Sequence, residues 1–430
     1  MADSSPRDRL AIVVGGGPAP GINGVISSVT IEAIHRGLDV IGIRDGFSHL
    51  IQRDTSKVVP LDIPAVAPYY LRGGSMLRTA RTNPTKDPAH MRNVLDSLAD
   101  LKVNYLVTIG GDDTAYTGSQ VYAQAGGGIR VAHVPKTIDN DLPLPKGIPT
   151  FGFETARHLG SLTARALHED ARTTGRWYIV VSMGRAAGHL ALGIGKASAA
   201  TLTLISEEFP HKKVTPKAIT ETILGSMVKR TAAGKDYGLV VLAEGLLDSI
   251  GEEGLRAVMT EEQIGRYGKI VKDPFNNLRL GELDFGRMVL DWLEAEMKPL
   301  GLTSSMIAKD LGYELRCADP IPFDVEYTRD LGYGAVKFLM SPEAAKYGAI
   351  VSVVGGELKP LRFEDMISPT TKKMRTREVD ATGVTYECAR RYMTRLEKAD
   401  FDDAGQLARL AAVVKLTPED FKKRFGHLVG

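Results

Sequence analysis

The amino-acid sequence predicts an α/β protein with two doubly wound domains and a helical C-terminal extension. Short apolar runs rich in β-branched residues alternate with amphipathic segments, which is the pattern of parallel strands connected by helices. The chain has 430 residues, more than one typical hydrophobic core supports. Beyond Val354 the sequence becomes charged and helix-prone, which indicates the extension.

The predicted strands share one feature, because each ends at a loop rich in glycine, proline or acidic residues. They lie at 10–14, 40–43, 105–109, 131–134, 178–181 and 239–242. The helices expected between and after them lie at 23–36, 91–101, 155–172 and 216–229. Ligands of doubly wound sheets bind beyond the carboxyl ends of the strands, so the site is expected in these loops.

Four further segments complete the element prediction. The apolar stretch 190–205 contains Lys196 and several Ser and Thr residues, which indicates a buried core element and not a membrane span. In the extension, helices are expected at 385–398 and 401–414, followed by a capped helix start at Thr417.

Charge and cysteine content exclude several classes of protein. The 54 Lys and Arg residues balance 52 Asp and Glu residues, so no overall basic field favours nucleic acid or an anionic membrane. Cys317 and Cys388 are far apart and provide neither a disulfide framework nor a clustered metal site. Residues 1–9 are polar and charged where a signal peptide is apolar. We therefore expect a soluble, cytoplasmic protein.

The loop after the first strand has the sequence GGGPAPG at 15–21 and precedes a helix. Its backbone N–H groups and the helix N-terminus are suited to a phosphate. Pro20 breaks the dinucleotide pattern and Ile22 breaks the Walker A pattern, so a tight structural turn remains an alternative.

Two acidic loops follow later strands. GGDDT at 110–114 places adjacent carboxylates at a strand end, where Asp112 can hold Mg²⁺ against substrate phosphates; the alternative is an acidic cap of the next helix. PKTIDND at 135–141 offers Asp139 as a base for a substrate alcohol and Lys136 as a cation for a transferring phosphoryl group; the alternative is an Asx-rich turn.

Two loops carry arginines beside glycines. In MGRAAGH at 183–189, Arg185 can engage phosphate through its planar guanidinium, whereas His189 is interpreted as a structural residue. In GGSMLRTAR at 73–81, Arg81 is the candidate for a phosphate contact; a solvated or surface-paired arginine is the alternative.

Taken together and in order, the segments GGGPAPGIN, GGSMLRTAR, GGDDT, PKTIDND, MGRAAGH, AEG and GYELR resemble the phosphofructokinase family from near the N-terminus to about residue 360. NAD kinases and lipid kinases also contain a GGD-type loop but lack the TIDND and MGR elements at these distances. The resemblance implies two Rossmann-like lobes with the active site in the cleft between them. Residues 1–150 with about 316–370 would bind the phosphoryl donor, 151–315 the sugar phosphate, and 371–430 would form the extension.

The resemblance also implies roles for individual residues. Asp139 corresponds to the catalytic base and Asp112 to the carboxylate associated with Mg²⁺. The residues implied in sugar-phosphate binding are Thr137, Asp141, Met183, Gly184, Arg185, Glu244, Tyr313 and Arg316, and Arg176 has the spacing of an arginine that reaches a neighbouring subunit. The second cross-subunit arginine of the bacterial ATP-using enzymes would align near Ile307, where only Lys309 is close. At least a homodimer with shared sites is implied.

The phosphoryl donor is predicted from two departures from the ATP-using pattern. Asp113 replaces a small residue and Lys136 replaces a glycine, and both changes resemble the pyrophosphate-dependent branch, as does Tyr313 in place of a histidine. Asp113 would repel a nucleotide, while Lys136, Arg81 and the backbone at Gly16 and Gly17 would hold pyrophosphate.

The expected reaction is reversible transfer between pyrophosphate and the 1-hydroxyl of fructose 6-phosphate, with Mg²⁺ as cofactor. The alternatives are an ATP-dependent phosphofructokinase and a catalytically silent regulatory subunit that binds sugar phosphates. Sedoheptulose 7-phosphate is a further candidate acceptor.

Overall fold

The structure is a computed structural model that describes residues 7–271, 282–371 and 373–429. The chain divides into two compact units, one made of residues 1–156 and 313–377 and the other of residues 157–312 and 378–430. Each unit contains a mainly or entirely parallel sheet with helices packed on it, and the C-terminal region is helical. The predicted α/β class is confirmed.

The first unit is built on a sheet with the strand order β13-β10-β5-β4-β1-β2-β3. Its parallel strands are β1 (Arg9–Val14), β2 (Asp39–Ile43), β4 (Val103–Gly110), β5 (Arg130–Pro135) and β10 (Ala349–Ile350). Both edge strands, β3 (Val58–Leu61) and β13 (Leu361–Arg362), are antiparallel to their neighbours. The predicted strands at 10–14, 40–43, 105–109 and 131–134 therefore form the parallel centre of this sheet.

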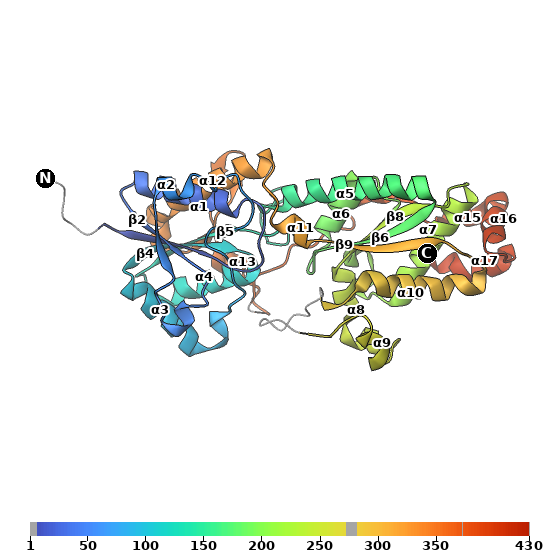
Figure 1. The fold of residues 1–430 in the computed structure, drawn as a ribbon, viewed down its shortest axis with the longest axis horizontal. Helices are drawn as coiled ribbons and strands as arrows, with labels where there is room; N and C mark the ends of the chain where they lie inside the picture. The colour runs from blue at the N-terminus through green and yellow to red at the C-terminus, as the bar shows by residue number, and fades with distance from the viewer. Residues whose placement is uncertain (1–6, 272–281, 372, 430) are drawn as a thin grey trace. The chain divides into compact units, whose positions relative to one another are not determined.

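Helices cover both faces of the first sheet (Figure 1). Alternation along β1 sets the two cores, because Leu10 and Ile12 belong to one and Ala11 and Val13 to the other. The first core includes α1 (Ile22–His35), α2 (Ile63–Val66) and α12 (Pro322–Leu339), and the second includes α3 (Pro88–Asp100) and α4 (Asp112–Gln124). Smaller elements of this unit are α11 (Tyr313–Arg316), β11 (Val353–Val354), β12 (Glu357–Leu358) and α13 (Phe363–Met366).

The second unit contains an entirely parallel sheet with the order β7-β8-β6-β9. The strands are β6 (Arg176–Ser182), β7 (Leu202–Leu204), β8 (Gly238–Ala243) and β9 (Ser305–Leu311). Around it lie α6 (His189–Ala197), α7 (Pro216–Ala232), α8 (Gly245–Arg256), α9 (Glu261–Gly265) and α10 (Phe285–Met297), while α5 (Phe153–Thr174) begins in the first unit and continues into the second.

The apolar stretch 190–205 is buried as predicted but is not one element. It forms most of α6 and then β7, separated by a turn in which Ala199 adopts a left-handed φ of 54°. Apolar composition does not distinguish a buried helix from a buried strand, so this break could not be predicted from composition.

The C-terminal region consists of α14 (Val384–Tyr392), α15 (Lys398–Asp402), α16 (Ala404–Val413) and α17 (Pro418–Phe425). The predicted helices at 385–398 and 401–414 were too long, because Met393 is extended and Asp403 starts a new helix as its N-cap. The predicted start at Thr417 is confirmed, since its hydroxyl accepts a hydrogen bond of 3.1 Å from the N–H of Asp420.

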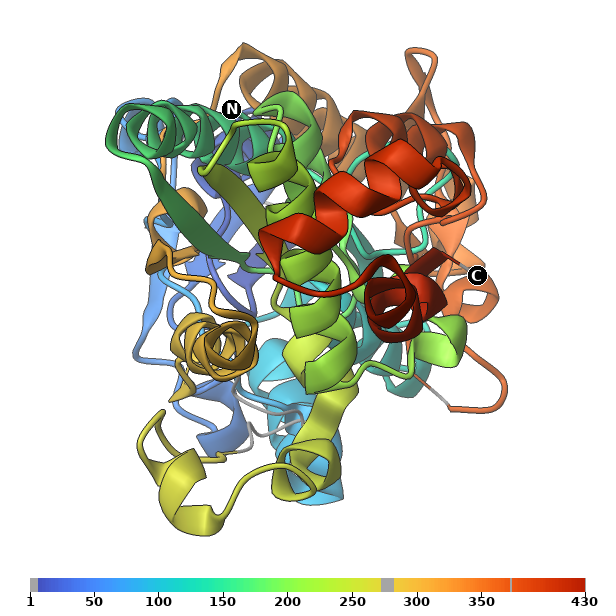
Figure 2. The same cartoon turned by 90° about the vertical axis from the view of Figure 1, so that its right-hand side faces the viewer.

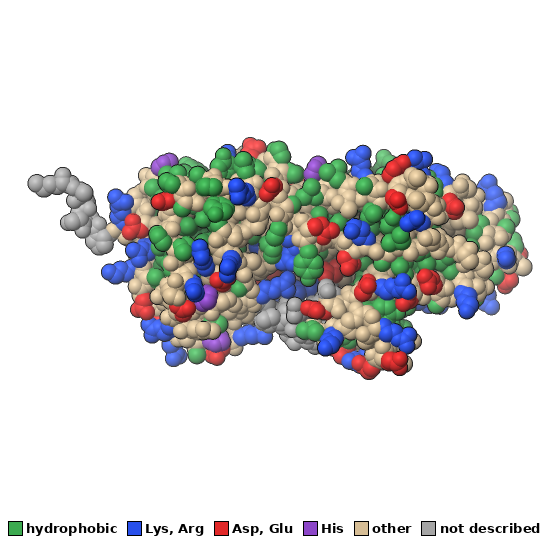
Figure 3. All heavy atoms as spheres, viewed as in Figure 1, with side chains coloured by type: hydrophobic (Ala, Val, Ile, Leu, Met, Phe, Trp, Pro, Cys, Tyr) green, Lys and Arg blue, Asp and Glu red, His purple; other side chains and the backbone are tan. Residues whose placement is uncertain are grey.

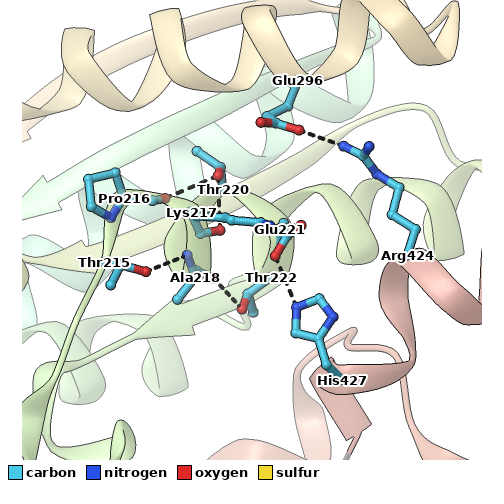
Figure 4. A network of polar contacts seen from close by, with 10 residues as sticks. All are labelled: Thr215, Pro216, Lys217, Ala218, Thr220, Glu221, Thr222, Glu296, Arg424 and His427. Atoms are coloured by element: carbon cyan, nitrogen blue, oxygen red, sulfur yellow. Dashed lines mark hydrogen bonds and ion pairs between the residues drawn. The ribbon is translucent and has the colours of Figure 1, made fainter. Parts of the chain in front are cut away.

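Helix α17 and the short 3-10 helix Gly426–Val429 that follows it bond to helices of the second unit (Figure 4). His427 Nε2 lies 2.9 Å from Glu221 Oε2 on α7, and Arg424 bonds Glu296 on α10 at 2.5 Å. Phe421 and Phe425 are fully buried and in ring contact, with centroids 4.8 Å apart. Figure 2 shows the red C-terminal helices beside the yellow-green α7. The extension is therefore an integral part of this unit.

Lys and Arg side chains are interspersed with Asp and Glu on the face drawn in Figure 3. This agrees with the formal net charge of +2. None of the helices in the described part of the chain combines the length and apolar character needed to cross a bilayer.

Candidate active site

The loops predicted to carry chemistry in the first unit follow β1, β4 and β5, which are neighbours in the sheet. The register pairs Val14 with Ile109 and Gly110 with Pro135, so the three strands end at the same level. The glycine loop, the acidic pair and the Lys136–Asp139 loop therefore meet at one edge, as expected for a doubly wound sheet.

The glycine loop is held closely against its neighbours. The N–H of Gly15 donates to Ile109 O and the N–H of Gly16 donates to Ala80 O, both at 2.9 Å. A Cβ at Gly15 would lie 2.4 Å from the Thr114 hydroxyl, and Gly16 has a left-handed φ of 79°. Both N–H groups bond inside the protein, so the amide of Gly16 is not available to a phosphate.

Three cationic side chains gather at this loop. Lys136 is buried, and its Nζ donates to Gly17 O. The guanidinium of Arg316 occupies the space that a side chain at Gly17 would fill, and its Nε lies 3.4 Å from Pro18 O. Arg81 follows Ala80, which is paired with Gly15, and is exposed. Glycine at position 17 is thus required for the approach of Arg316.

The three cations affect one another. Burial, followed by the charge of Arg316, lowers the pKa of Lys136 to about 8, with a smaller contribution from Arg81 and an opposing one from Asp139. Burial and the charge of Arg81 also lower the pKa of Arg316. Gathering like charges in a partly desolvated place costs free energy unless an anion binds there. The other arginine of the 73–81 segment, Arg78, instead lies 3.7 Å from Asp45.

Asp112 and Asp113 occupy the first turn of α4, directly after β4. The N-cap of this helix is Gly111, so neither carboxylate stands at the capping position that the alternative interpretation required. Both residues are half-buried. In the part of the chain that the structure describes, no group of three or more His, Cys, Asp or Glu residues is arranged to hold a metal. One or two carboxylates are what Mg²⁺ commonly takes from a protein when substrate phosphates and water complete its shell. The donor set fits that ion.

The loop that carries Asp139 is stabilised by its own polar groups. The hydroxyl of Thr137 accepts from the N–H of Asp139 at 3.0 Å, and Thr150 donates to Thr137 O at 2.7 Å. Asn140 has a left-handed φ of 57°, and its side-chain oxygen accepts from the N–H of Thr150. The predicted polar turn therefore exists, and it presents Asp139 next to a buried lysine.

In the second unit, the loop after β6 meets the loop after β8. Glu244 Oε2 accepts from the N–H of Gly184 at 3.2 Å, and Gly245 donates to Gly184 O at 3.0 Å. A Cβ at Gly245 would lie 2.5 Å from Arg185 O, so glycine is needed for this approach. Met183 is anchored by a 3.0 Å bond from its N–H to Leu311 O at the end of β9. The predicted sugar-phosphate residues Met183, Gly184, Arg185 and Glu244 lie together.

Arg176 does not join them. It begins β6, whereas Met183 follows the last residue of this strand, so roughly 20 Å of strand separates the two along the sheet. Its Nε is buried and lies 4.0 Å from Asp170 Oδ2. Of the GYELR residues, Arg316 is buried at the glycine loop of the first unit, while Tyr313 is 68% exposed with its ring 5.4 Å from the Arg316 guanidinium.

Sequence reasoning missed three residues near these loops. His133 is fully buried between the Thr108 hydroxyl at 2.8 Å and Gly110 O at 3.0 Å, and burial lowers its pKa to about 3. A polar residue within a buried strand run was the available signal. Glu207 accepts from the N–H of Gly188 at 2.8 Å and from that of Val379 at 3.1 Å. Arg377 contacts the Asp139 loop. Neither of the last two lies in a recognisable motif.

Known proteins resemble the chain over most of its length. The family model described as Phosphofructokinase matches residues 9–339. A Thermotoga maritima protein named pyrophosphate--fructose 6-phosphate 1-phosphotransferase is 48% identical over 421 residues, covering 98% of each chain. A Naegleria fowleri protein of the same name is 48% identical over 428 residues, covering 98% of this chain and 95% of the relative.

Solved structures with little sequence identity share the fold. A pyrophosphate-dependent phosphofructokinase from Nitrosospira multiformis has a TM-score of 0.64 at 17% identity, with 90% of each chain covered. Phosphofructokinase from Saccharomyces cerevisiae has a TM-score of 0.63 at 17% identity, and the match covers 98% of this chain but 50% of the yeast chain. Given the family match and the full-length relatives, the chain belongs to the phosphofructokinase family.

Proposed function

We propose that the chain is a pyrophosphate-dependent phosphofructokinase that transfers phosphoryl groups reversibly between pyrophosphate and the 1-hydroxyl of fructose 6-phosphate. The observation that carries the proposal is the convergence of Lys136, Arg316 and Arg81 on the glycine loop, beside the acidic turn of α4. This much local positive charge suits a small, highly charged donor. The full-length relatives bear the name of this activity.

In the proposed reaction the sugar 1-oxygen attacks the terminal phosphorus of pyrophosphate in line. The new O–P bond forms as the bridging P–O bond breaks and phosphate leaves. Asp139 accepts the proton of the 1-hydroxyl, while Lys136 and Arg81 stabilise the charge of the transferring group. Gly17 and the turn at Gly16 shape the donor site, and Thr137 and Asp141 flank the base.

Asp112 is the proposed protein contribution to a Mg²⁺ site. When bound, the ion would neutralise phosphate charge. The chain provides few ligands there, so substrate phosphates and water would complete the shell.

Binding of fructose 6-phosphate is assigned to Met183, Gly184, Arg185 and Glu244 of the second unit. In the first unit, Tyr313 and Arg316 are assigned as further substrate-binding residues. Glu244 already holds the Gly184 backbone and so links a sugar-hydroxyl contact to the shape of the phosphate loop.

Donor selection is assigned to Asp113, and its replacement by asparagine or glycine should shift the preference toward ATP. Like-charge repulsion at close range in a partly desolvated site is worth about 1 kcal/mol or more, or about fivefold in the ratio of kcat/KM values. Steady-state kinetics with both donors provide the measurement. Asparagine keeps the shape and removes the charge, so a shift in the glycine variant alone would assign the effect to size. An unchanged preference in both variants would contradict the charge argument.

Arg176 is assigned to the sugar-phosphate site of a neighbouring subunit, because roughly 20 Å of strand separates it from the phosphate loop of its own chain. We therefore expect a homodimer or higher homo-oligomer with shared sites. Sedimentation velocity combined with activity measurements tests this expectation, and a fully active monomer would contradict it. Location in the cytoplasm is expected from the cysteine content, and cell fractionation would test it.

The proposed function is tested by coupled assays of the purified protein with Mg²⁺, fructose 6-phosphate and either pyrophosphate or ATP. Turnover with pyrophosphate supports the proposal. Turnover with ATP alone would establish the ATP-dependent alternative, and sugar-phosphate binding without turnover would establish the regulatory one.

A further inference from the structure

Arg377 lies beyond the family-matched residues 9–339 and is the last residue of the first unit before the chain enters the second. None of the motifs identified in the sequence includes this residue or its neighbours. Its side chain is half-buried, and burial lowers its pKa, while the nearby charge of Asp141 acts in the opposite direction. A guanidinium remains protonated in this setting.

The guanidinium of Arg377 donates hydrogen bonds to several oxygen atoms of one loop, residues 137–150. Its Nε donates to Asn140 O at 3.1 Å, and its Nη1 donates to Ile148 O at 2.7 Å and lies 3.5 Å from Leu144 O. Its Nη2 donates to the side-chain oxygen of Asn140. The backbone N–H of Arg377 adds a bond of 2.7 Å to the carbonyl oxygen of Asp141.

These contacts fall where the loop has no regular structure of its own. Residues 137–150 form neither helix nor strand, and their carbonyl groups need donors from elsewhere. Asn140 is held in a left-handed conformation that non-glycine residues seldom adopt. Because Asn140 follows Asp139 directly, a contact that fixes Asn140 also fixes the backbone from which Asp139 projects.

We propose that Arg377 is a positioning residue for the Asp139 loop and sets the geometry of the general base without touching substrate. The inference rests on the proposed function, because it takes Asp139 as the base. An arginine is needed for this role, because its planar guanidinium has donors on several sides. The single ammonium group of a lysine cannot reach all of these oxygens at once.

The test compares Arg377→Lys, Arg377→Ala and Arg375→Ala in the full-length protein. Arg375 is an exposed arginine two residues away and is the matched control. A displacement of the base of about 1 Å costs on the order of 100-fold in rate, so kcat should fall by about 10- to 100-fold in Arg377→Ala and less in Arg377→Lys. The KM for fructose 6-phosphate should change little. Added guanidinium ion, but not the same concentration of NaCl, should restore part of the Arg377→Ala rate.

Hydrogen exchange provides a readout that does not need activity. Amides of residues 137–150 should exchange faster in both Arg377 variants, while those of β1 and α1 keep their wild-type rates. Wild-type exchange in the loop would overturn the proposal, as would faster exchange with a kcat equal to that of Arg375→Ala. If the wild-type protein turns over neither donor, the proposed function fails, and loop exchange alone then decides whether Arg377 holds the loop.

Discussion

Replacement of Asp139 by serine is expected to lower kcat by about 10²- to 10⁴-fold, the range that a positioned general base contributes. Serine retains a small polar side chain but cannot accept the proton of the sugar hydroxyl at neutral pH. Because the N–H of Asp139 makes the bond to the Thr137 hydroxyl, the turn should survive the substitution. Sugar-phosphate binding, measured by calorimetry, should therefore remain close to wild type.

Asp402→Ser is the matched control, since Asp402 is an exposed aspartate at the end of α15. It should have wild-type kinetics. If Asp139→Ser keeps a kcat near that of the control, Asp139 is not the base. If the variant instead loses sugar-phosphate binding together with turnover, the residue acts in binding and the assignment of its role must change.

Lys136→Met is expected to lower kcat with pyrophosphate by about 10²- to 10³-fold, as the loss of one preorganised charge contact does in other active sites. The same variant should be more stable than the wild type. Burial lowers the pKa of Lys136 to about 8 from an ordinary value of 10.5, so keeping it charged at pH 7 costs the folded state about 3 kcal/mol. Loss of the bond to Gly17 offsets part of the gain, leaving about 1 to 3 kcal/mol.

The sign of the pH dependence follows from the same shift. The folded state releases the Lys136 proton near pH 8 and the unfolded state near pH 10.5, so wild-type stability should rise relative to the variant between these values. In the free enzyme, kcat/KM for pyrophosphate should fall as pH rises through about 8. Urea unfolding and pH-rate profiles of the two proteins provide the measurements. A variant that is less stable and fully active would contradict both expectations.

Much of the fold was predictable because apolar strands rich in β-branched residues have strong signals. The central strands of the first sheet are apolar runs that end at glycine or proline, and their order places the predicted loops side by side. The edge strands β3 and β13 were not predicted, because β3 contains Pro60, which is unusual within a strand, and β13 has only two residues. The break after α14 was missed because helix propensity remains high through Met393.

The candidate site also contains residues that could be predicted from the sequence and residues that could not. The residues that we propose to act on phosphate lie mostly in loops at strand ends, and both their chemistry and their position in the sequence mark them. His133, Glu207 and Arg377 act on backbone N–H and C=O groups of those loops. Backbone N–H and C=O groups occur at nearly every position of any sequence. A side chain that bonds to them therefore cannot be recognised from a sequence motif. Only the folded chain shows that Arg377 bonds to the loop that carries Asp139.

The initial rate with Mg²⁺ and fructose 6-phosphate, measured at equal concentrations of pyrophosphate and ATP, identifies the phosphoryl donor. We expect rapid formation of fructose 1,6-bisphosphate with pyrophosphate and little with ATP. Rapid formation with ATP and none with pyrophosphate would show that pyrophosphate is not the donor.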